Sequence, residues 1–371
     1  QNTSKYETNR QSNKELKLIR DLQQAVAEYA PGSQVVADGR LYTSRYIRKL
    51  PQTNGHDWEE VYIAECKNEA CRTWNHRRVE PLEEGEKCIS CQKVIEKKYW
   101  KKAIEPRKGF VAEFKSEDVP IRKPERLYRS EDFYIGDLMR RVTSKKTFVF
   151  DGGNKVQFET SINDSLMVVC QEKFYVCDRC GYAISVKESS DKRDFSRYAG
   201  SQEIKHESPW GKECTGKLWP RRLCHAFKTD VVRIVFGTSK AQARNLMLSV
   251  MYALLEAVSE ELHIERTDLK GCLHKVRYQG SMINAVMLYD AVAGGAGHVK
   301  RLVTDDGKIF QKVVQTAIDI TKNCQCDPSC YHCLRNYYNQ SVHDFLDRKM
   351  AYQFLAEFKG TPEPVEDTTF E

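Results

Sequence analysis

Hydrophobic residues recur at helical spacing near the beginning of the sequence. Leu18, Leu22 and Val26 lie about one turn apart and predict a helix over 15–29, which ends before Pro31. The next segment, over 34–44, has the pattern of two short strands around an Asp-Gly dipeptide, which favours a tight hairpin turn. We therefore expect a helix followed by a β-hairpin.

The last third of the chain alternates between strand and helix patterns. Apolar runs of strand length are separated by longer amphipathic segments, and a glycine-rich turn follows the third strand. The pattern predicts strands over 231–236, 274–278 and 285–289, and helices over 241–262 and 308–321. Because alternating elements of this kind form an α/β unit, we expect a small mixed sheet with flanking helices.

No segment has the pattern of a membrane-spanning helix. The most apolar stretch, over 246–258, is interrupted by Ser249 and Glu256, and no run approaches the roughly eighteen apolar residues that a span needs. We therefore expect no membrane partner. The 14 cysteines in 371 residues and the lack of an apolar signal segment favour a reducing, cytoplasmic location. Gln1 in place of Met favours a fragment or a processed chain.

Four cysteines lie within ten residues near the end of the sequence. Their spacing allows four thiolates to converge on one tetrahedral zinc ion, and Pro328 favours the turn that this requires. The alternatives are a pair of cramped disulfides or a run of buried free thiols, but the polar residues between the cysteines disfavour a core position. The predicted zinc ligands are Cys324, Cys326, Cys330 and Cys333.

An earlier set of cysteines has the spacing of a zinc ribbon. Cys66 and Cys71 are separated by four residues, Cys88 and Cys91 by two, and sixteen residues lie between the two pairs. A strand pattern over 61–64 leads directly into the first pair. We predict that these four thiols bind a second zinc ion.

Cys177 and Cys180 begin a third candidate site. Gly181 permits the tight turn that follows the second thiol of a zinc knuckle. The residues within reach for the other two ligands are His206, Cys214, Cys224 and His225. We select His206 and Cys214, because Cys224 lies in an apolar run that leads into the next strand. The sequence therefore predicts up to three zinc ions.

Positive charge is concentrated between residues 93 and 129. Twelve Lys and Arg residues occur there against six Asp and Glu, whereas the whole chain has a net charge of +7. Interleaved aromatic residues make this a mixture suited to neutralising a nucleic-acid backbone while bases stack. The alternative is a solvated linker whose aromatics pack on neighbouring domains. The predicted contacts to single-stranded DNA are Lys97, Lys98, Lys101 and Lys102 for phosphates, and Tyr99 or Trp100 for a base.

The glycine-rich turn after the third predicted strand is a second candidate DNA contact. Backbone N–H groups around Gly295 and Gly297, with Lys300 and Arg301 beside them, can bind a phosphate without reading the base sequence. The alternative is a turn that needs glycine only for packing.

The same turn also matches a nuclease motif. His298, Lys300 and Asp305 have the His-x-Lys-x4-Asp spacing of phospholipase D-like nucleases, in which the histidine attacks phosphorus and the lysine binds the oxyanion. Those enzymes use two copies of the motif, and this chain contains one. A nuclease is therefore an alternative function.

Several of these motifs occur together and in this order in one family. They are residues 29–42, the Cys177/Cys180 knuckle, residues 225–230, residues 288–297 and the final four cysteines. In this combination the chain resembles the C-terminal region, with the zinc-binding domain, of bacterial DEAD/DEAH-box helicases of the mitomycin-repair type. Related regions occur in anti-phage defence helicases and their partner subunits. Two features depart from the family: Cys224 replaces a usual glycine, and the Cys66–Cys91 ribbon is not shared by all members.

The resemblance implies a DNA-binding accessory to a superfamily-two helicase motor, acting in DNA repair or anti-phage defence. It also implies that the final four cysteines match the zinc ligands of the family. The chain has no ATP-binding phosphate loop, no Asp-Glu-Ala-Asp/His box and no arginine-finger motif, so we expect no catalytic residues in it. The motor is expected in the same polypeptide or in a separate subunit. A protein scaffold that docks a helicase into a defence complex is the other alternative.

These patterns predict an α/β fold preceded by zinc-ribbon-like modules. We expect a helix and hairpin in 1–60, the first ribbon in 61–106, a basic and aromatic connection in 107–165, the second ribbon in 166–226, and the α/β zinc-binding domain in 227–371.

Overall fold

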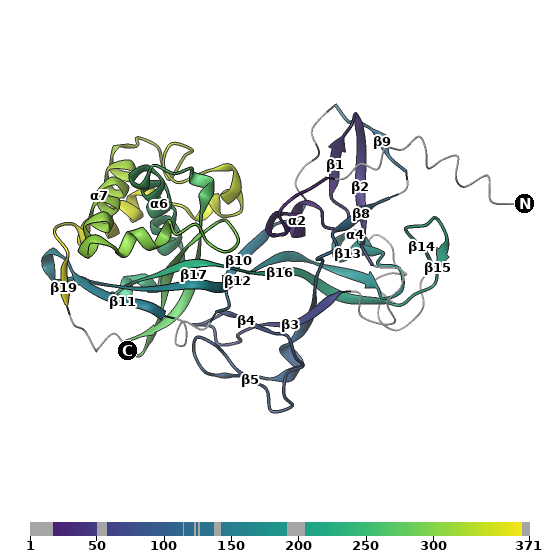
Figure 1. Cartoon of the computed structure of the whole chain (residues 1–371), viewed down its shortest axis with the longest axis horizontal. Coiled ribbons are helices and arrows are strands. Elements are labelled where there is room, and N and C mark those ends of the chain that lie inside the picture. The colour runs from purple at the N-terminus through teal and green to yellow at the C-terminus, as the bar shows by residue number, and fades with distance from the viewer. Residues whose placement is uncertain are drawn as a thin grey trace, which may run out of the picture.

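Two long strands form the spine of the molecule in the computed structural model, which describes residues 18–49, 58–113, 115–121, 124, 127–136, 142–190 and 205–365. The strands β12 (Lys155–Cys177) and β16 (Leu218–Phe236) are antiparallel and run along the long axis (Figure 1). Their pairing extends from Val156 and Phe236 at one end to Cys177 and Leu218 at the other. The spine therefore connects the two ends of the molecule.

The spine belongs to an eleven-stranded sheet, whose main path is β19-β11-β12-β16-β7-β3-β4. The β16–β7 pair is parallel, and the other pairs in this sheet are antiparallel. The mixed α/β class is confirmed, but the sheet is larger than expected. Its other strands are β3 (Glu59–Glu65), β4 (Trp74–Arg77), β7 (Lys101–Glu105), β10 (Ser130–Tyr134), β11 (Val142–Val149), β13 (Ala183–Ser185), β17 (Leu269–Tyr278), β18 (Ser281–Asp290) and β19 (Glu363–Val365).

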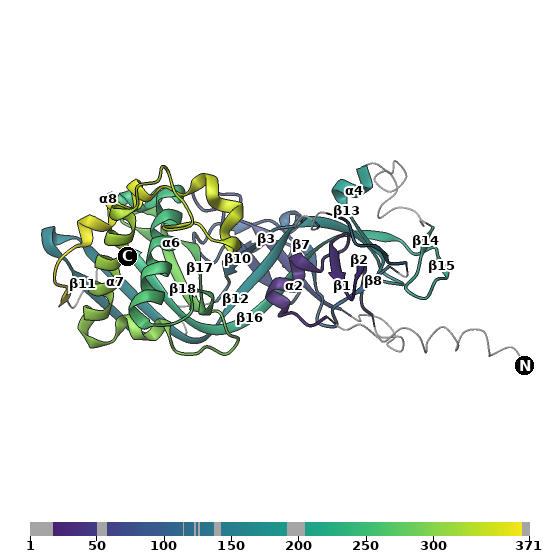
Figure 2. The same cartoon turned by 90° about the horizontal axis from the view of Figure 1, so that it is seen from above.

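The main hydrophobic core lies at one end of the spine, where α6 (Arg244–Leu262), α7 (Lys308–Asn323) and α8 (Arg348–Leu355) cover one face of the sheet (Figure 2). Apolar side chains occur almost all round α6, so this helix is buried between the sheet and the other helices. In α7 the buried residues recur every three or four positions: Phe310, Val313, Val314, Ala317 and Ile318. Both helices predicted in this region are confirmed, with α6 beginning at Arg244.

The other end of the spine carries smaller elements. The expected hairpin is confirmed as β1 (Gln34–Ala37) and β2 (Arg40–Ile47), with positive φ angles at Asp38 and Gly39 in its turn. The first helix, α2 (Leu22–Glu28), is capped by the Asp21 side chain, and residues 15–17 of the expected helix lie outside the described residues. The remaining small elements at this end are β8 (Phe110–Ala112), β9 (Glu117–Asp118), α4 (Val186–Ser190), β14 (His206–Glu207) and β15 (Glu213–Cys214). β5 (Glu86–Lys87) pairs with β6 (Val94–Ile95) below the middle of the spine in Figure 1.

Short 3₁₀ segments connect several of these elements. They are Lys97–Tyr99, Asp151–Gly153, Ser239–Gln242, Arg266–Asp268, Val299–Val303, Asp305–Gly307, Tyr337–Phe345 and Ala356–Phe358. The glycine-rich turn thus leads into a 3₁₀ segment rather than directly into an α-helix. Among the described helices, none has the length and apolar character needed to cross a membrane.

Candidate metal centres and the glycine-rich loop

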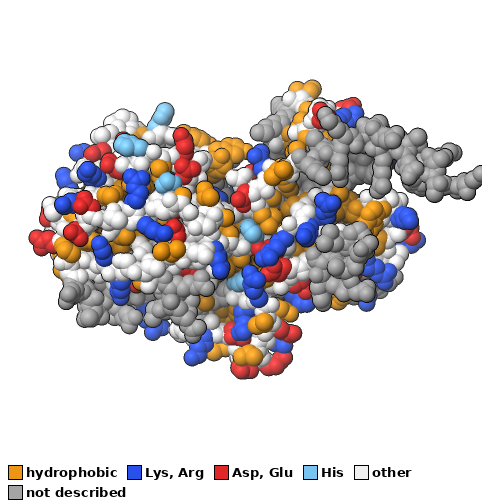
Figure 3. Space-filling model, in the orientation of Figure 1, with side chains coloured by type: hydrophobic (Ala, Val, Ile, Leu, Met, Phe, Trp, Pro, Cys, Tyr) orange, Lys and Arg blue, Asp and Glu red, His pale blue; other side chains and the backbone are white. Residues whose placement is uncertain are grey.

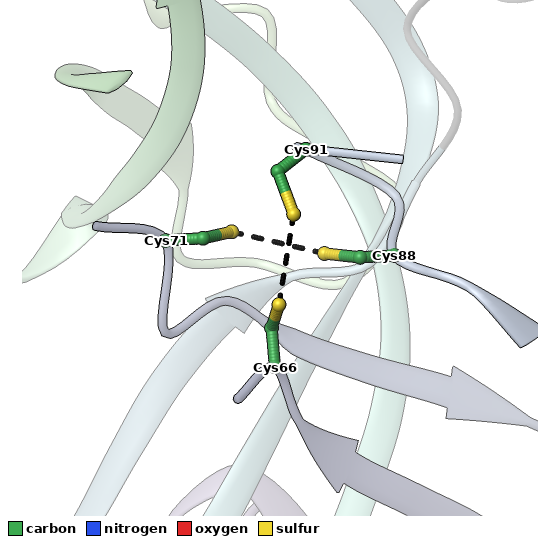
Figure 4. A group of neighbouring side chains, drawn as sticks. All are labelled: Cys66, Cys71, Cys88 and Cys91. Atoms are coloured by element: carbon green, nitrogen blue, oxygen red, sulfur yellow. Dashed lines mark hydrogen bonds between the residues drawn. The ribbon is translucent and has the colours of Figure 1, made fainter. Parts of the chain in front are cut away.

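The four cysteines of the first predicted ribbon point toward one another (Figure 4). Cys66 follows β3, Cys71 lies in the next turn, and Cys88 and Cys91 flank the turn between β5 and β6. The Sγ atoms of Cys66 and Cys91 are 3.6 Å apart, and those of Cys71 and Cys88 are 3.7 Å apart. All four side chains are buried, together with Ala64, Ile95 and Trp100. These thiols therefore form the centre of a small separate core.

Backbone geometry in two turns explains how the thiols converge. Arg72 and Gln92, the residues that follow the second cysteine of each pair, adopt left-handed φ angles of 53° and 60°. Gly181 occupies the same place after Cys180, with a φ of 79° and an N–H that donates to Cys177 O at 3.1 Å. A Cβ atom at Gly181 would lie 2.2 Å from Ile47 O. The prediction that this glycine permits a tight turn is confirmed.

Sequence patterns did not predict a contribution from Asn75 to the first group. Its side chain is buried, donates to Cys88 Sγ at 3.6 Å and accepts a hydrogen bond from Ile89 N at 2.9 Å. A hydrogen bond from Cys71 is the largest cause that lowers the pKa of Cys88, to about 4, and the same contact raises the pKa of Cys71. Asn75 further stabilises the Cys88 thiolate. The group is thus prepared to bind a cation through at least one ionised sulfur.

The second group contains the residues selected from the sequence. Cys180 Sγ lies 3.2 Å from His206 Nε2, and Cys177 Sγ lies 3.9 Å from Cys214 Sγ. The hydrogen bond from Cys180 is the largest cause that lowers the pKa of Cys177, to about 3. The rejected candidates lie elsewhere on β16: Cys224 is buried, and His225 Nδ1 lies 2.6 Å from Glu105 Oε1.

The last four cysteines also come together, immediately after α7. Sγ–Sγ distances are 3.4 Å between Cys324 and Cys326, 3.5 Å between Cys324 and Cys330, and 3.6 Å between Cys326 and Cys333. The backbone N–H of Cys326 is the main cause that lowers the pKa of Cys324, to about 7. Arg348 at the start of α8 donates to Cys326 O at 2.6 Å. The loop is thereby attached to the helical core.

The geometry of all three groups fits a tetrahedral metal ion. Within each group the donor atoms lie within 4.8 Å of one another. Thiolates bound to zinc at about 2.3 Å lie about 3.8 Å apart, close to the Sγ–Sγ distances here, whereas a disulfide needs about 2.05 Å. The cysteines are free thiols. The first and third groups offer four thiols each, and the second offers three thiols and the imidazole of His206. All three can therefore hold soft or borderline metal ions such as zinc.

The lysines of the predicted DNA-contact segment are exposed or half-buried, and most pair with acidic side chains. Lys97 pairs with Glu80 at 2.9 Å, Lys98 with Glu96 at 2.6 Å, and Lys102 with Glu60 at 3.0 Å. Lys101 Nζ donates to the backbone of Lys98. On the face seen in Figure 3, basic side chains lie next to acidic ones. The pairs of Lys97 and Lys98 are exposed and therefore weak, so an incoming phosphate can replace their carboxylates, whereas Glu60 also binds Arg221 at 2.9 Å.

The two aromatic residues of this segment have different surroundings. Trp100 is 7% exposed and donates from Nε1 to Ile95 O at 3.3 Å, within the core of the first cysteine group. Burial therefore removes Trp100 as a stacking residue. Tyr99 is partly exposed, and the ammonium groups of Lys67 and Lys98 lie 5.2 and 5.0 Å from its ring centroid. Tyr99 remains as the stacking candidate.

The glycine-rich loop closes around an internal carboxylate. Asp290 Oδ2 accepts hydrogen bonds from the N–H groups of Ala296 at 2.7 Å, Gly297 at 2.6 Å and His298 at 3.2 Å, and Oδ1 accepts one from Val299 at 3.1 Å. The Asp290 side chain is fully buried. It thus occupies the position that we expected for a DNA phosphate. The expected phosphate contact at Gly295 and Gly297 is corrected accordingly.

The basic residues beside this loop are also engaged. Lys300 Nζ lies 2.6 Å from the Oδ2 atom of the buried Asp230, and Arg301 Nη1 donates to Leu262 O at 3.4 Å. Gly295 has a φ of 80°, and a Cβ atom there would lie 2.4 Å from the Asp230 carboxyl carbon. Gly295 therefore serves close packing, and Lys300 is held by a carboxylate rather than left to bind an oxyanion. This contact disfavours the phospholipase D-like alternative.

Comparisons with known proteins find similarity over parts of this chain. Residues 250–334, which include the last four cysteines, match the family described as the MrfA Zn-binding domain. Druantia protein DruE of Escherichia coli (strain UMEA 4076-1) is 26% identical over 55% of this chain, which spans 12% of the length of DruE.

Two solved structures are also similar to parts of the chain. The DUF1998 helicase MrfA bound to DNA matches 65% of this chain and 26% of MrfA, at 12% identity and a TM-score of 0.34. MrfA bound to DNA and AMPPNP matches 57% of this chain and 27% of MrfA, at 13% identity and a TM-score of 0.28. The resemblance to helicases of the mitomycin-repair type is confirmed over residues 250–334, which match the MrfA Zn-binding domain family.

Proposed function

We propose that this chain is a non-catalytic DNA-binding module of a superfamily-two helicase, which holds single-stranded DNA as it leaves the motor in DNA repair or anti-phage defence. The observation that carries the proposal is the MrfA Zn-binding domain at 250–334. The similarity to DruE and the motif combination shared with DEAD/DEAH-box helicases support the same context. The motor domains lie in the same polypeptide or in a separate subunit.

In this proposal the three cysteine groups bind zinc and stabilise the fold. Each group supplies four ligands, which leaves no open position for a reacting water. The ligands are Cys66, Cys71, Cys88 and Cys91 in the first site, Cys177, Cys180, His206 and Cys214 in the second, and Cys324, Cys326, Cys330 and Cys333 in the third. The metal sites therefore position DNA contacts without taking part in chemistry.

The proposed DNA contacts in the first zinc module are Lys97, Lys98, Lys101, Lys102 and Tyr99. They follow the first cysteine group, with Lys101 and Lys102 at the start of β7, and the exposed carboxylate partners of Lys97 and Lys98 are exchangeable. The proposal is tested by equilibrium binding of labelled single-stranded DNA to the zinc-loaded chain at a series of salt concentrations. Because each phosphate contact releases counterions, affinity will fall steeply with salt.

Replacing the four lysines of the first module with alanine will flatten this salt dependence. The slope of log affinity against log salt will decrease by about 0.7 for each lysine that contacts a phosphate. A matched control removes four exposed lysines elsewhere, Lys308, Lys312, Lys322 and Lys359, for the same change in net charge. If the two quadruple variants have the same slope, the DNA path does not cross the first zinc module.

A further inference from the structure

A cavity of about 520 Å³ lies between the first cysteine group and the MrfA Zn-binding domain. Its walls come from the turn after Cys71, from β10 and β17, and from the first half of α6. The 3₁₀ segment Tyr337–Phe345, which follows the last cysteine group, lines it as well. β10 and β17 lie near the middle of the long axis in Figure 1. The volume is in the range of natural ligand sites, so the cavity can take a ligand of nucleotide size.

The cavity is lined by more basic than acidic side chains. Four cations line it, and two of them are paired: Arg72 with Glu65 at 3.6 Å, and Arg244 with Glu131 at 3.1 Å. The third acidic residue of the lining, Asp132, accepts a hydrogen bond from Tyr289 at 2.7 Å. The other two cations, Arg129 and Lys275, remain without a carboxylate.

Arg129 and Lys275 make no ion pair within the described part of the chain. Lys275 is half-buried on β17, where its charge is poorly solvated. Burial is the main cause that lowers the pKa of Lys275; the charge of Cys71 raises it, and nearby Arg244 lowers it. Because a partly desolvated ammonium without a carboxylate partner is costly, an anionic group in the cavity would be stabilised.

The same cavity presents aromatic rings to solvent. Tyr338 and Phe345 line it and remain 64% and 45% exposed. The ring of Trp74, which also lines the cavity, is already covered by Phe133, with centroids 5.5 Å apart, and by the Arg222 guanidinium at 5.6 Å. Tyr338 meets the ring of Tyr337 edge-on, with centroids 5.5 Å apart, but stays largely exposed. Tyr338 and Phe345 are therefore the rings left for stacking, and every nucleobase offers a π-face to such rings.

We propose that this cavity holds one nucleotide of a single-stranded nucleic acid, with its base stacked against Tyr338 and Phe345 and its phosphate beside Lys275 and Arg129. The inference rests on the proposed function and assigns a specific binding site to it. A strand held here lies beside the first and the third cysteine groups, because the turn after Cys71 and the segment after Cys333 form two of the walls. The site binds the strand independently of its base sequence.

Two variants test the two halves of this site on the full zinc-loaded chain with a labelled oligothymidylate. Tyr338→Ala combined with Phe345→Ala will weaken binding about tenfold or more and leave the salt slope unchanged, because stacking releases no counterion. Lys275→Met, which keeps an apolar stem, will reduce the slope by about 0.7. Tyr337→Ala is the matched control, since Tyr337 is 55% exposed and adjacent but does not line the cavity.

Photocrosslinking gives an independent location for the strand. An oligonucleotide with 5-iodouracil will crosslink to the peptide that contains Tyr338 and Phe345. Zinc content and melting temperature equal to the wild type will show that each variant is folded. If the wild-type chain binds DNA but the cavity variants bind as well as Tyr337→Ala and the crosslinks map elsewhere, the cavity proposal is wrong and the proposed function stands. If the wild-type chain does not bind the strand, both fail.

Discussion

Cys88→Ser will remove one zinc ion per chain and unfold the ribbon over residues 66–95. Cys88 is fully buried, and the core around it consists of the four thiols and only three other buried residues. A structural zinc ion contributes on the order of 10 kcal/mol in small modules, and so few apolar contacts cannot replace that contribution. Serine supplies a hydroxyl that stays protonated at neutral pH and is a poor zinc ligand.

Metal analysis and hydrogen exchange measure this effect. Zinc content will fall by one ion per chain, and amides of β5, β6 and the two cysteine turns will lose protection, while those of α6 and α7 keep theirs. Cys224→Ser is the matched control, because Cys224 is equally buried but belongs to none of the three groups. Equal zinc content in the two variants would contradict the assignment of Cys88 as a ligand.

Asp290→Ala will destabilise the region that contains the glycine-rich loop by about 3 kcal/mol or more. The substitution leaves four backbone N–H groups of the glycine-rich loop without the carboxylate that now accepts their hydrogen bonds. Each buried donor without a partner costs about 1–3 kcal/mol, partly offset where water reaches the loop. Urea denaturation followed by the circular dichroism of the helical core measures the loss.

Asp290→Asn separates the shape of the side chain from its charge. Asparagine has nearly the same shape and keeps one oxygen acceptor, so it will recover part of the stability that alanine loses. Binding to single-stranded DNA at low salt will be unchanged in folded Asp290→Asn, because the loop N–H groups face Asp290 rather than a phosphate. Tighter DNA binding by this variant would show that the loop does accept a phosphate once the internal charge is removed.

Local spacing predicted the cysteine groups well because knuckle geometry is short-range. The structure brings together Cys177 and Cys180 as the spacing indicates, and the left-handed turn at Gly181 depends only on neighbouring residues. Spacing alone does not distinguish His206 and Cys214 from Cys224 as the other two ligands of this group. The apolar run around Cys224 is what excludes it. In the structure this run is part of the long strand β16.

The long strands were harder to predict because polar residues interrupt their apolar pattern. The pairing of β12 with β16 shifts register between Ser161 and Asp164 and again between Val169 and Lys173. At such bulges the two-residue alternation changes phase, and the sequence resembles separate short strands. The expected domain boundaries at 165/166 and 226/227 lie inside these two strands. Both ends of the molecule therefore share one sheet.

Contacts that the spacing of residues does not indicate explain the remaining differences. The glycine-rich loop has the local pattern of a phosphate site, but its N–H groups donate to Asp290. Asp290 directly precedes the loop, and its carboxylate is the sequence signal that could have indicated an internal acceptor. Trp100 looks like a stacking residue beside lysines, yet it folds into the thiol core. The cavity is assembled from segments separated by more than 200 residues, so sequence patterns could not reveal it.

The most direct measurement is fluorescence anisotropy of labelled single-stranded DNA titrated with the purified, zinc-loaded chain in the absence of any helicase motor. The account predicts saturable binding at low salt that weakens steeply as salt increases, with the slope giving the number of phosphate contacts. An absence of binding at low salt by a folded chain that retains its zinc would contradict a DNA-binding module, and would favour a scaffold that contacts only the helicase.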